Sequence, residues 1–347
     1  MKLSINRFKG RLLIGVFLLG ILWMPTTVFA KNPQSTTPDE PVTISILPKL
    51  PTDNIGGQYL GYFNLPKQTT QQRTEKINIF NSTAKAIQVK LNVVDAETGE
   101  NGVIRYTKAR STASDLLVQP GSRLITVPSK LTIASNASVD VPITIQRPRQ
   151  FSGTKAAAIQ IRALADASTS ADSIQNEYLY TVGLLLNGTP LTKKQRNPLK
   201  LDRITLQKMA GETTAFELHF TNPVPSYLKQ MKLNVTFVNQ KLRFFTYQQK
   251  RTEMKVAPSS RFGTTLELKG KKLVAGYYRV TVDNHNDSGH QTQTYYVKID
   301  RERVRFIPKN TYQTMQRRYR ISLGSVLVTA GMVFGAVAVF MKRKKAK

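Results

Sequence analysis

The sequence contains no cysteine in 347 residues. Disulfide bonds, thiolate metal ligands and a cysteine nucleophile are therefore excluded. Exported domains often use disulfide bonds for stability, and an exported chain without them has to depend on the size of its apolar cores.

The short motifs that usually identify an active site are also missing. The chain has no Gly-x-Ser-x-Gly, no glycine-rich phosphate loop and no His-Glu-x-x-His. We therefore predict a protein that is not an enzyme, with no catalytic residue and no cofactor. One enzymatic alternative stays open, a glycosidase with dispersed carboxylates, because two acidic side chains far apart in sequence can meet in the fold.

Histidine is scarce, and two of the three histidines fall in one stretch, Val282 to His290, together with two aspartates. Zinc would need three or four converging ligands. The alternative is a hairpin, because Asn, Asp, Ser and Gly favour the turn between two strands. We favour the hairpin and predict no metal site. The third histidine, His219, is expected on the face of its strand opposite Phe216 and Phe220.

Acidic side chains are few, since 21 Asp and Glu stand against 51 Lys and Arg, a formal net charge of +30. The excess is unevenly distributed. Residues 31–185 carry 16 basic and 12 acidic side chains, net +4, whereas residues 186–320 carry 26 and 9, net +17. Such a field attracts anionic polymers, anionic headgroups or acidic partner proteins, and salt weakens the attraction.

Basic residues of the second half are therefore the candidates for a partner-binding surface. We select Lys250, Arg251, Arg261, Lys271 and Lys272. A solvated basic surface without a partner is the alternative. Nucleic acid is attracted by the same kind of field, but it is not expected as a partner, because the two ends of the chain place this region outside the cell.

Long apolar runs occur at both ends. Residues 1–30 combine early basic residues, an apolar stretch over 12–24 and small residues before position 31, which is the pattern of a cleaved signal peptide. Ile321 to Met341 contains 21 residues without a charged side chain, enough to cross a hydrocarbon core of about 30 Å as a helix. We predict one transmembrane helix over 321–341 and a basic tail over 342–347.

These ends predict the topology. A cleaved signal peptide followed by a spanning helix places residues 31–320 outside and the basic tail in the cytoplasm. Arg317, Arg318 and Arg320 on the outer flank oppose this orientation, but a large translocated domain outweighs local charge. We therefore predict a single-pass protein of the cell membrane facing the cell wall, and the lack of cysteine is common in surface proteins of Gram-positive bacteria.

The part between the ends has a strand pattern. Short runs rich in Val, Ile, Thr and aromatics alternate with turn residues, and in Val139 to Ile145 every second side chain is apolar. We predict an all-β ectodomain of two tandem immunoglobulin-like sandwiches, over 31–187 and 188–320, with the joint in the polar stretch 191–200. Ile79-Phe80-Asn81 and Phe220-Thr221-Asn222 form a weak internal repeat, called here the internal echo, between the two predicted sandwiches.

The stretch Gln58 to Leu65 gathers three aromatic residues around a glycine. If exposed, the rings can stack on sugars, and if buried they belong to the core, with strand alternation placing Tyr59 and Phe63 on one face. The glycan-contact candidates in and beside this stretch are Asn54, Gln58, Tyr59, Tyr62 and Asn64.

Several short motifs resemble the WxL Interacting Protein family of Gram-positive cell surfaces. In the first half these are Pro51 to Asn54, Gly61 to Leu65 and Pro148 to Gly153. In the second half, Val256 to Phe262 is similar to the family's Ala-Pro-Asn-Ser-x-Phe, and Leu273 to Tyr278 is similar to its Leu-x-x-Gly-x-Tyr.

The resemblance implies a division of labour. It implies that the first domain binds peptidoglycan and that the second binds WxL-type surface proteins or host extracellular matrix proteins. A membrane-anchored adhesin or scaffold is therefore the expected function, with the glycosidase as the alternative.

Overall fold

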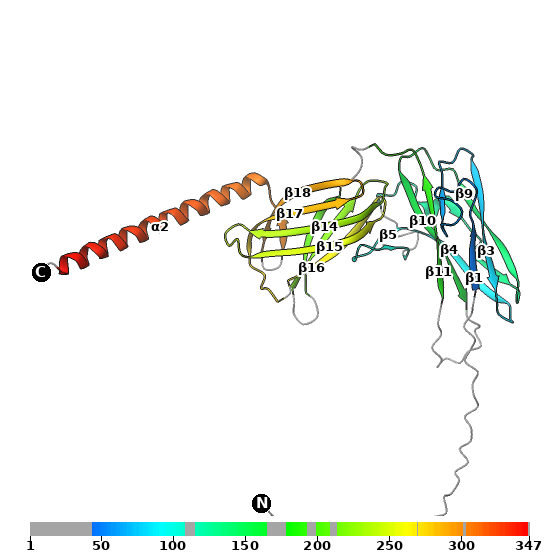
Figure 1. Ribbon diagram of the computed structural model, residues 1–347, viewed down its shortest axis with the longest axis horizontal. Coiled ribbons are helices and arrows are strands. Elements are labelled where there is room, and N and C mark those ends of the chain that lie inside the picture. Colours follow the sequence, from blue (N-terminus) through cyan, green and yellow to red (C-terminus); the bar gives the residue numbers. More distant parts are fainter. Residues whose placement is uncertain are drawn as a thin grey trace, which may run out of the picture. The chain divides into compact units, whose positions relative to one another are not determined.

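The computed structural model describes residues 44–107, 115–164, 178–192, 199–208, 214–268, 270–300 and 303–345. The predicted signal peptide, residues 1–30, lies outside the described residues. The described part forms two immunoglobulin-like β-sandwiches followed by a long helix (Figure 1). The fold class predicted from the sequence is therefore confirmed.

The first sandwich consists of a four-stranded and a five-stranded sheet. The first sheet has the order β1 (Ile44–Lys49), β3 (Gln72–Asn81), β9 (Ser138–Gln146) and β7 (Ile125–Thr126). The second has the order β2 (Phe63–Leu65), β11 (Leu179–Asn187), β10 (Thr154–Leu164), β4 (Ile87–Asp95) and β8 (Lys130–Ile133). Between β4 and β7 the chain forms a ribbon of β5 (Glu97–Thr98) and β6 (Ile104–Arg105) and a single helical turn, α1 (Gly121–Leu124).

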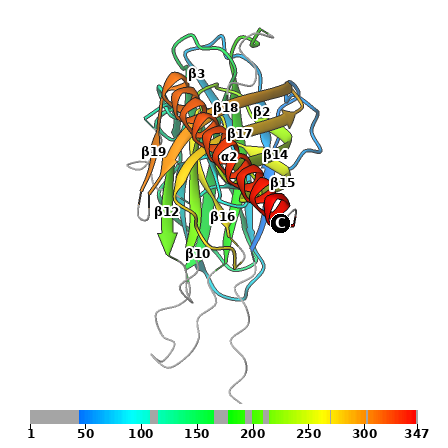
Figure 2. The same ribbon diagram turned by 90° about the vertical axis from the view of Figure 1, so that its left-hand side faces the viewer.

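The second sandwich consists of a three-stranded and a five-stranded sheet. The smaller sheet has the order β12 (Lys200–Lys208), β13 (Thr214–Asn222) and β16 (Ser260–Glu267). The larger has the order β15 (Thr246–Val256), β14 (Leu228–Asn239), β17 (Gly276–Asn286), β18 (Gly289–Ile299) and β19 (Val304–Phe306). Figure 2, turned by 90°, makes β2, β12 and β19 easier to locate.

Alternating side chains build each core. On β9, Val141, Ile143 and Ile145 are buried while Pro142 between them is exposed, as the sequence pattern predicts. On β13, Phe216 and Phe220 are both fully buried. Each such side chain contributes about 1.5–3 kcal/mol by leaving water, and these contributions hold the two sheets of each sandwich together.

The two sandwiches share one strand order. The run β1, β3, β9 corresponds to β12, β13, β16, and the run β8, β4, β10, β11 corresponds to β15, β14, β17, β18. Asn81 ends β3 and Asn222 ends β13, so the internal echo of the sequence falls at equivalent places.

Both of these asparagines are fully buried and fix the loops that follow their strands. Asn81 Nδ2 donates to the carbonyls of Lys85, Ile133 and Ala134 over 2.8–3.2 Å. Asn222 Nδ2 donates to the carbonyls of Ser226 and Ala257, each over 2.9 Å. Because both side chains are buried and bond to main-chain carbonyls, an apolar residue in either place would remove these bonds and destabilise the loop.

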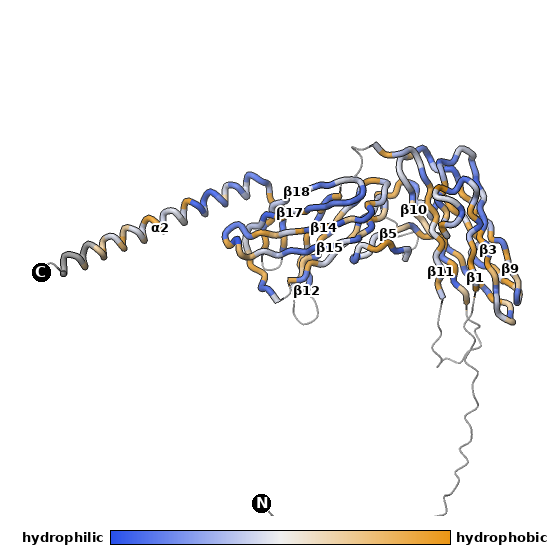
Figure 3. The backbone as a smooth tube through the Cα atoms, viewed as in Figure 1, coloured by the Kyte–Doolittle hydropathy of each residue, from blue (hydrophilic) through white to orange (hydrophobic). Residues whose placement is uncertain are grey.

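The C-terminal helix α2 runs from Lys309 to Lys345 and contains the whole predicted span, 321–341. It begins 12 residues before that span, which the sequence pattern did not predict. The part from Lys309 to Ala338 includes an apolar stretch after Arg320 and is long enough to cross a membrane. Figure 3 shows the helix changing from hydrophilic to hydrophobic along its length.

The buried asparagines give a stability prediction. Replacing Asn81 by Ala removes three hydrogen bonds from a buried side chain to main-chain carbonyls, and we expect a loss of about 2 kcal/mol or more in the free energy of unfolding. Asn222→Ala should have a similar effect on the second sandwich. Asn78→Ala is the matched control on β3, because Asn78 bonds only to Asp140 at the surface and should cost less than about 0.5 kcal/mol.

Urea unfolding of each variant measures the difference. An Asn81→Ala midpoint equal to that of Asn78→Ala would show that the loop carbonyls do not depend on this side chain.

Candidate functional site

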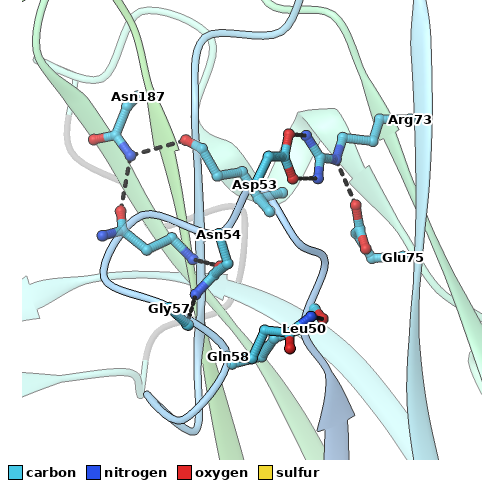
Figure 4. A network of polar contacts seen from close by, with 10 residues as sticks. Leu50, Asp53, Asn54, Gly57, Gln58, Arg73, Glu75 and Asn187 are labelled. Carbon is cyan, nitrogen blue, oxygen red and sulfur yellow. Dashed lines mark hydrogen bonds and ion pairs between the residues drawn. The ribbon is translucent and has the colours of Figure 1, made fainter.

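The loop over residues 50–62 joins β1 to β2 and carries the predicted glycan-contact residues of the first sandwich. Asn54 is buried, and its Oδ1 accepts from the amide of Asn64 over 2.7 Å while its Nδ2 donates to the carbonyl of Gly57 over 2.8 Å. The amide of Ile55 in turn donates to the Asn64 carbonyl over 2.8 Å. Asn54, which Figure 4 shows, is therefore turned inward and holds the loop, and the half-buried Asn64 of β2 is its partner.

A second set of contacts ties this loop to the larger sheet. Asn187, at the end of β11, donates from Nδ2 to Asn64 Oδ1 and to the Leu65 carbonyl, both over 2.8 Å. Its own Oδ1 accepts from the Thr154 hydroxyl over 2.8 Å. The loop is thus anchored to strands that are more than 90 residues away in sequence.

An ion pair holds the other side of the loop. Two nitrogens of the Arg73 guanidinium donate to the two carboxylate oxygens of Asp53 over 2.6 and 2.8 Å, and Arg73 Nε also donates to Glu75 (Figure 4). The hydrogen bond from Arg73 lowers the pKa of Asp53. This two-pronged geometry fixes the direction of the loop more firmly than a single contact.

The tip of the loop faces solvent. Tyr59 is fully exposed, and Gln58 is exposed with its Nε2 3.4 Å from the Leu50 carbonyl. The expectation that strand alternation places Tyr59 beside Phe63 is wrong, because Phe63 is buried and residues 51–62 form turns rather than a strand. Gly56 and Gly57 have φ of +90° and +92°, which turns the chain away from an extended course.

Tyr62 lies apart from Tyr59. Its side chain is half-buried against β11, where a Cβ at Gly183 would meet the Tyr62 Cβ at 3.4 Å. The five predicted residues therefore divide into a frame, made by Asn54 and Asn64, a half-buried Tyr62, and an exposed pair, Gln58 and Tyr59.

A cleft of about 160 Å³ was not predicted from the sequence. It is lined by Lys67, Gln68, Arg147, Pro148, Arg149, Gln150, Phe151, Asn187 and Gly188. Asn187 belongs both to this cleft and to the anchor of the loop, so the two features adjoin. The segment 148–153 was noted as a family motif, but only the fold brings it next to β11.

The basic candidates of the second sandwich do not form one cluster. Lys250 is exposed, and Arg251 follows it on β15 and is half-buried on the opposite face. Arg261 forms an ion pair with Asp115 at the start of β16, whereas Lys271 and Lys272 lie in the loop after that strand ends. An eight-residue strand is about 26 Å long, so these two groups lie at opposite ends of β16.

The stretch Val282 to His290 is the hairpin that the sequence favoured. β17 ends at Asn286 and β18 begins at Gly289, and the Ser288 amide donates to Asn286 Oδ1 over 2.8 Å. Asp283 lies 2.5 Å from His290 Nε2, and this contact lowers the pKa of the carboxyl. Within the described ranges, no three His, Cys, Asp or Glu side chains converge as metal ligands do.

His219 is partly exposed, as expected, and contacts Thr205 and Glu217 on the outer face of its sheet. Arg203, Gly263 and neighbouring residues form with it a hollow of about 490 Å³.

Two further perturbed ionisable groups, Asp95 and Lys155, are internal to the first sandwich. Burial raises the pKa of Asp95, whose carboxylate accepts from the hydroxyl and amide of Ser122 over 2.5 and 3.1 Å. Burial lowers the pKa of Lys155, whose Nζ donates to the Val118 carbonyl over 2.5 Å. This group fastens α1 to β4 and β10, and none of its members lines the clefts described above.

The Asp53 carboxylate gives a pH prediction. Because its folded pKa lies below the ordinary value near 3.8, the ion pair adds stability above that pH, and this stability is lost as pH falls through the lowered pKa. Asp53 is half exposed, so we expect the Asp53→Asn variant to lose only about 0.5 kcal/mol at neutral pH.

Urea midpoints of the two proteins should therefore differ above about pH 4 and converge at lower pH. A difference that persists unchanged down to pH 2 would contradict the role of the charge.

Comparison with known proteins identifies a family for both halves of the chain. The model of the WxL Interacting Protein peptidoglycan binding domain matches residues 44–163, and the model of the WxL Interacting Protein host binding domain matches residues 169–308. The second match begins before β11, although β11 pairs with β10 and β2 of the first sandwich. No curated protein matches the chain.

Solved structures with a similar fold are bacterial fimbrial chaperones. The class 5 fimbriae chaperone CfaA has 9% identity and a TM-score of 0.31, covering 74% of this chain and 100% of its own. The Salmonella enterica SafA pilin complex with the SafB chaperone has 12% identity and a TM-score of 0.32, with coverages of 76% and 99%. The E. coli chaperone DraB has 12% identity and a TM-score of 0.29, with coverages of 75% and 98%.

The two family models together cover most of the chain, in the order that the sequence motifs predicted. The host-binding and peptidoglycan-binding regions are thus both present, one after the other, and the chain belongs to the WxL Interacting Protein family.

Proposed function

We propose that this chain is a membrane-anchored, non-enzymatic surface adhesin or scaffold. Its first sandwich binds peptidoglycan, its second binds WxL-type surface proteins or host matrix proteins, and α2 holds both at the cell membrane. The cell-surface binding role follows from the two family models, which describe binding domains. The named partners, the anchor and its orientation are the parts that we propose.

One observation carries the glycan assignment. Tyr59 is fully exposed at the tip of a loop whose base is fixed by buried hydrogen bonds and an ion pair. An aromatic ring presented on a rigid frame can stack on a sugar without first losing conformational freedom. The adjoining cleft adds the amides of Gln68 and Gln150 and the basic groups of Lys67, Arg147 and Arg149. Amides and basic groups suit the hydroxyl, amide and carboxylate groups of a peptidoglycan strand.

The second sandwich offers a different kind of surface. Lys250 is exposed on the outer face of β15, and on the same face Gln248 Nε2 donates to Asn234 Oδ1 over 2.9 Å. A polar sheet face with a basic edge suits an acidic protein partner better than an apolar one. The charge excess of residues 186–320 supports the same assignment.

The anchor rests on α2. Its apolar part is long enough to span a bilayer, and exposed apolar side chains such as Phe334 and Val337 would be costly in water. We propose that residues 44–320 face the wall and that the basic end of the chain lies in the cytoplasm.

Peptidoglycan binding is tested by sedimentation with insoluble peptidoglycan. Removing the ring in Tyr59→Ala should weaken binding about five- to tenfold, because a stacked ring contributes about 1 kcal/mol or more. Tyr178→Ala is the matched control, since Tyr178 is also an exposed tyrosine of the first sandwich but directly precedes β11 and is not part of the loop over residues 50–62. Equal binding by both variants would overturn the assignment to the loop.

Partner binding by the second sandwich is tested by its salt dependence. We expect capture of a WxL-bearing protein to fall several-fold between about 50 and 500 mM salt, because exposed charges are screened. Lys250→Glu should weaken capture further, whereas Lys130→Glu, on the equivalent strand β8 of the first sandwich, should not. Capture that is insensitive to salt and to both variants would rule out the basic surface.

A further inference from the structure

Three arginines on the outer flank of the apolar run remain unexplained by the proposed function. Arg317, Arg318 and Arg320 precede Ile321 directly and oppose the usual excess of basic residues on the cytoplasmic side. All three are exposed on the surface of α2.

The first turns of α2 pack on that end of the sandwich. The Tyr312 ring is buried against Tyr296 of β18, with ring centroids 4.6 Å apart. Gln240 Nε2 donates to the Tyr312 carbonyl over 3.3 Å. The helix is therefore docked on the second sandwich before it reaches its apolar part.

The loop over residues 240–245, which joins β14 to β15, lies beside the next two turns of the helix. Lys241 Nζ lies 5.4 Å from the centre of the Tyr319 ring, a cation–π contact. Tyr319 is only two residues before Ile321, which corresponds to about 3 Å along a helix. The loop thus lies at the level where the chain would enter the bilayer.

This loop has the composition of a membrane-interface segment. Phe244 is 76% exposed at its turn, and its ring lies tilted against that of Phe245, with centroids 4.6 Å apart. Lys241 and Arg243 are both exposed beside it. Basic residues flanking an exposed aromatic ring are typical of segments that insert the ring among anionic lipid headgroups.

The loop is held in shape rather than free. Asn239 Oδ1 accepts from the amides of Lys241 and Leu242, each over 2.9 Å, and the Phe245 amide donates to the Leu242 carbonyl over 2.9 Å. Little conformational entropy is therefore lost when the tip binds a surface.

A neighbouring loop adds charge of the same sign. Lys271 and Lys272 lie in the 268–275 connection, and Lys271 Nζ donates to the Thr246 carbonyl over 3.3 Å at the base of the 240–245 loop. Neither loop contains an acidic residue. Lys271 and Lys272, first selected as partner contacts, therefore belong to the end of the sandwich that carries α2.

We propose that the 240–245 loop is a second membrane contact, with the Phe244 ring seated among the anionic headgroups of the leaflet that α2 enters. Lys241, Arg243, Lys271, Lys272 and the three flanking arginines supply the complementary charge. The inference rests on the proposed anchoring by α2. The loop contact would hold the second sandwich against the membrane, whereas a single helix would leave the sandwich free to rotate.

The test uses the full chain reconstituted into vesicles of phosphatidylglycerol and phosphatidylcholine, with lipids brominated near the headgroup as quenchers. Trp23, the only tryptophan, is replaced by Phe, and Phe244→Trp supplies the single fluorophore. Val118→Trp is the matched control, because Val118 has the same exposed fraction, 76%, in the first sandwich. Flotation of the vesicles measures anchoring separately.

We expect the tryptophan at 244 to be quenched at least about threefold more than the control, because the ring sits among headgroups. Adding Lys241→Glu and Arg243→Glu should abolish most of that difference, and so should vesicles without phosphatidylglycerol. A chain that floats with the vesicles but shows equal quenching at both positions overturns the loop contact and leaves the anchor intact.

Two further outcomes of this experiment would overturn the loop contact for different reasons. A chain that does not float overturns the anchoring and with it the loop contact. Emission at 244 that responds to soluble polyphosphate but not to anionic vesicles assigns the loop to a wall polymer instead and overturns the lipid contact.

Discussion

Burial of two facing apolar surfaces is the interaction on which both sandwiches depend, because the chain has no disulfide bond to add. The side chains that meet between the sheets come from alternate positions of each strand, so the strands themselves are fixed by the core. The loops at the strand ends are outside that core. They need separate contacts if they are to hold a defined shape.

Asparagine supplies those contacts repeatedly. Five strands, β3, β11, β13, β14 and β17, end in asparagine at positions 81, 187, 222, 239 and 286. In each case the side chain forms hydrogen bonds with main-chain groups or polar side chains outside the strand. These bonds take the place of the interstrand main-chain hydrogen bonds, which end with the strand. An asparagine at the strand end thus fixes a loop without a cross-link, and the loops over residues 50–62 and 240–245 are both held in this way.

Strands and turns, which depend on local periodicity and turn residues, could be predicted from the sequence. Features that depend on contacts between distant residues could not. Alternation identified β9 and β13 with their buried faces, and the turn residues between Val282 and His290 identified the hairpin. Alternation was wrong for Tyr59, because two glycines with positive φ interrupt the strand pattern. Hydropathy alone missed the 12 residues of α2 before the span, because most of them are polar or basic.

The candidate sites were harder still. Asn187 and the cleft beside it unite segments around residues 64, 148 and 187, and no local pattern relates them. The basic candidates were chosen by charge, but strand geometry separates Lys250 from Arg251 and Arg261 from Lys271. The distances between these basic residues in the folded protein, rather than their charge alone, determine which of them can contact the same partner.

The helix α2 contains no proline between Lys309 and Lys345 and has the buried Tyr312 in its first turn. A flexible linker would absorb a pull on the protein, whereas a continuous helix docked at one end transmits it as a bending moment. If α2 spans the membrane as proposed, mechanical load from a bound surface would tilt the helix in the lipid, and shear on the cell would act within the bilayer rather than be dissipated outside it.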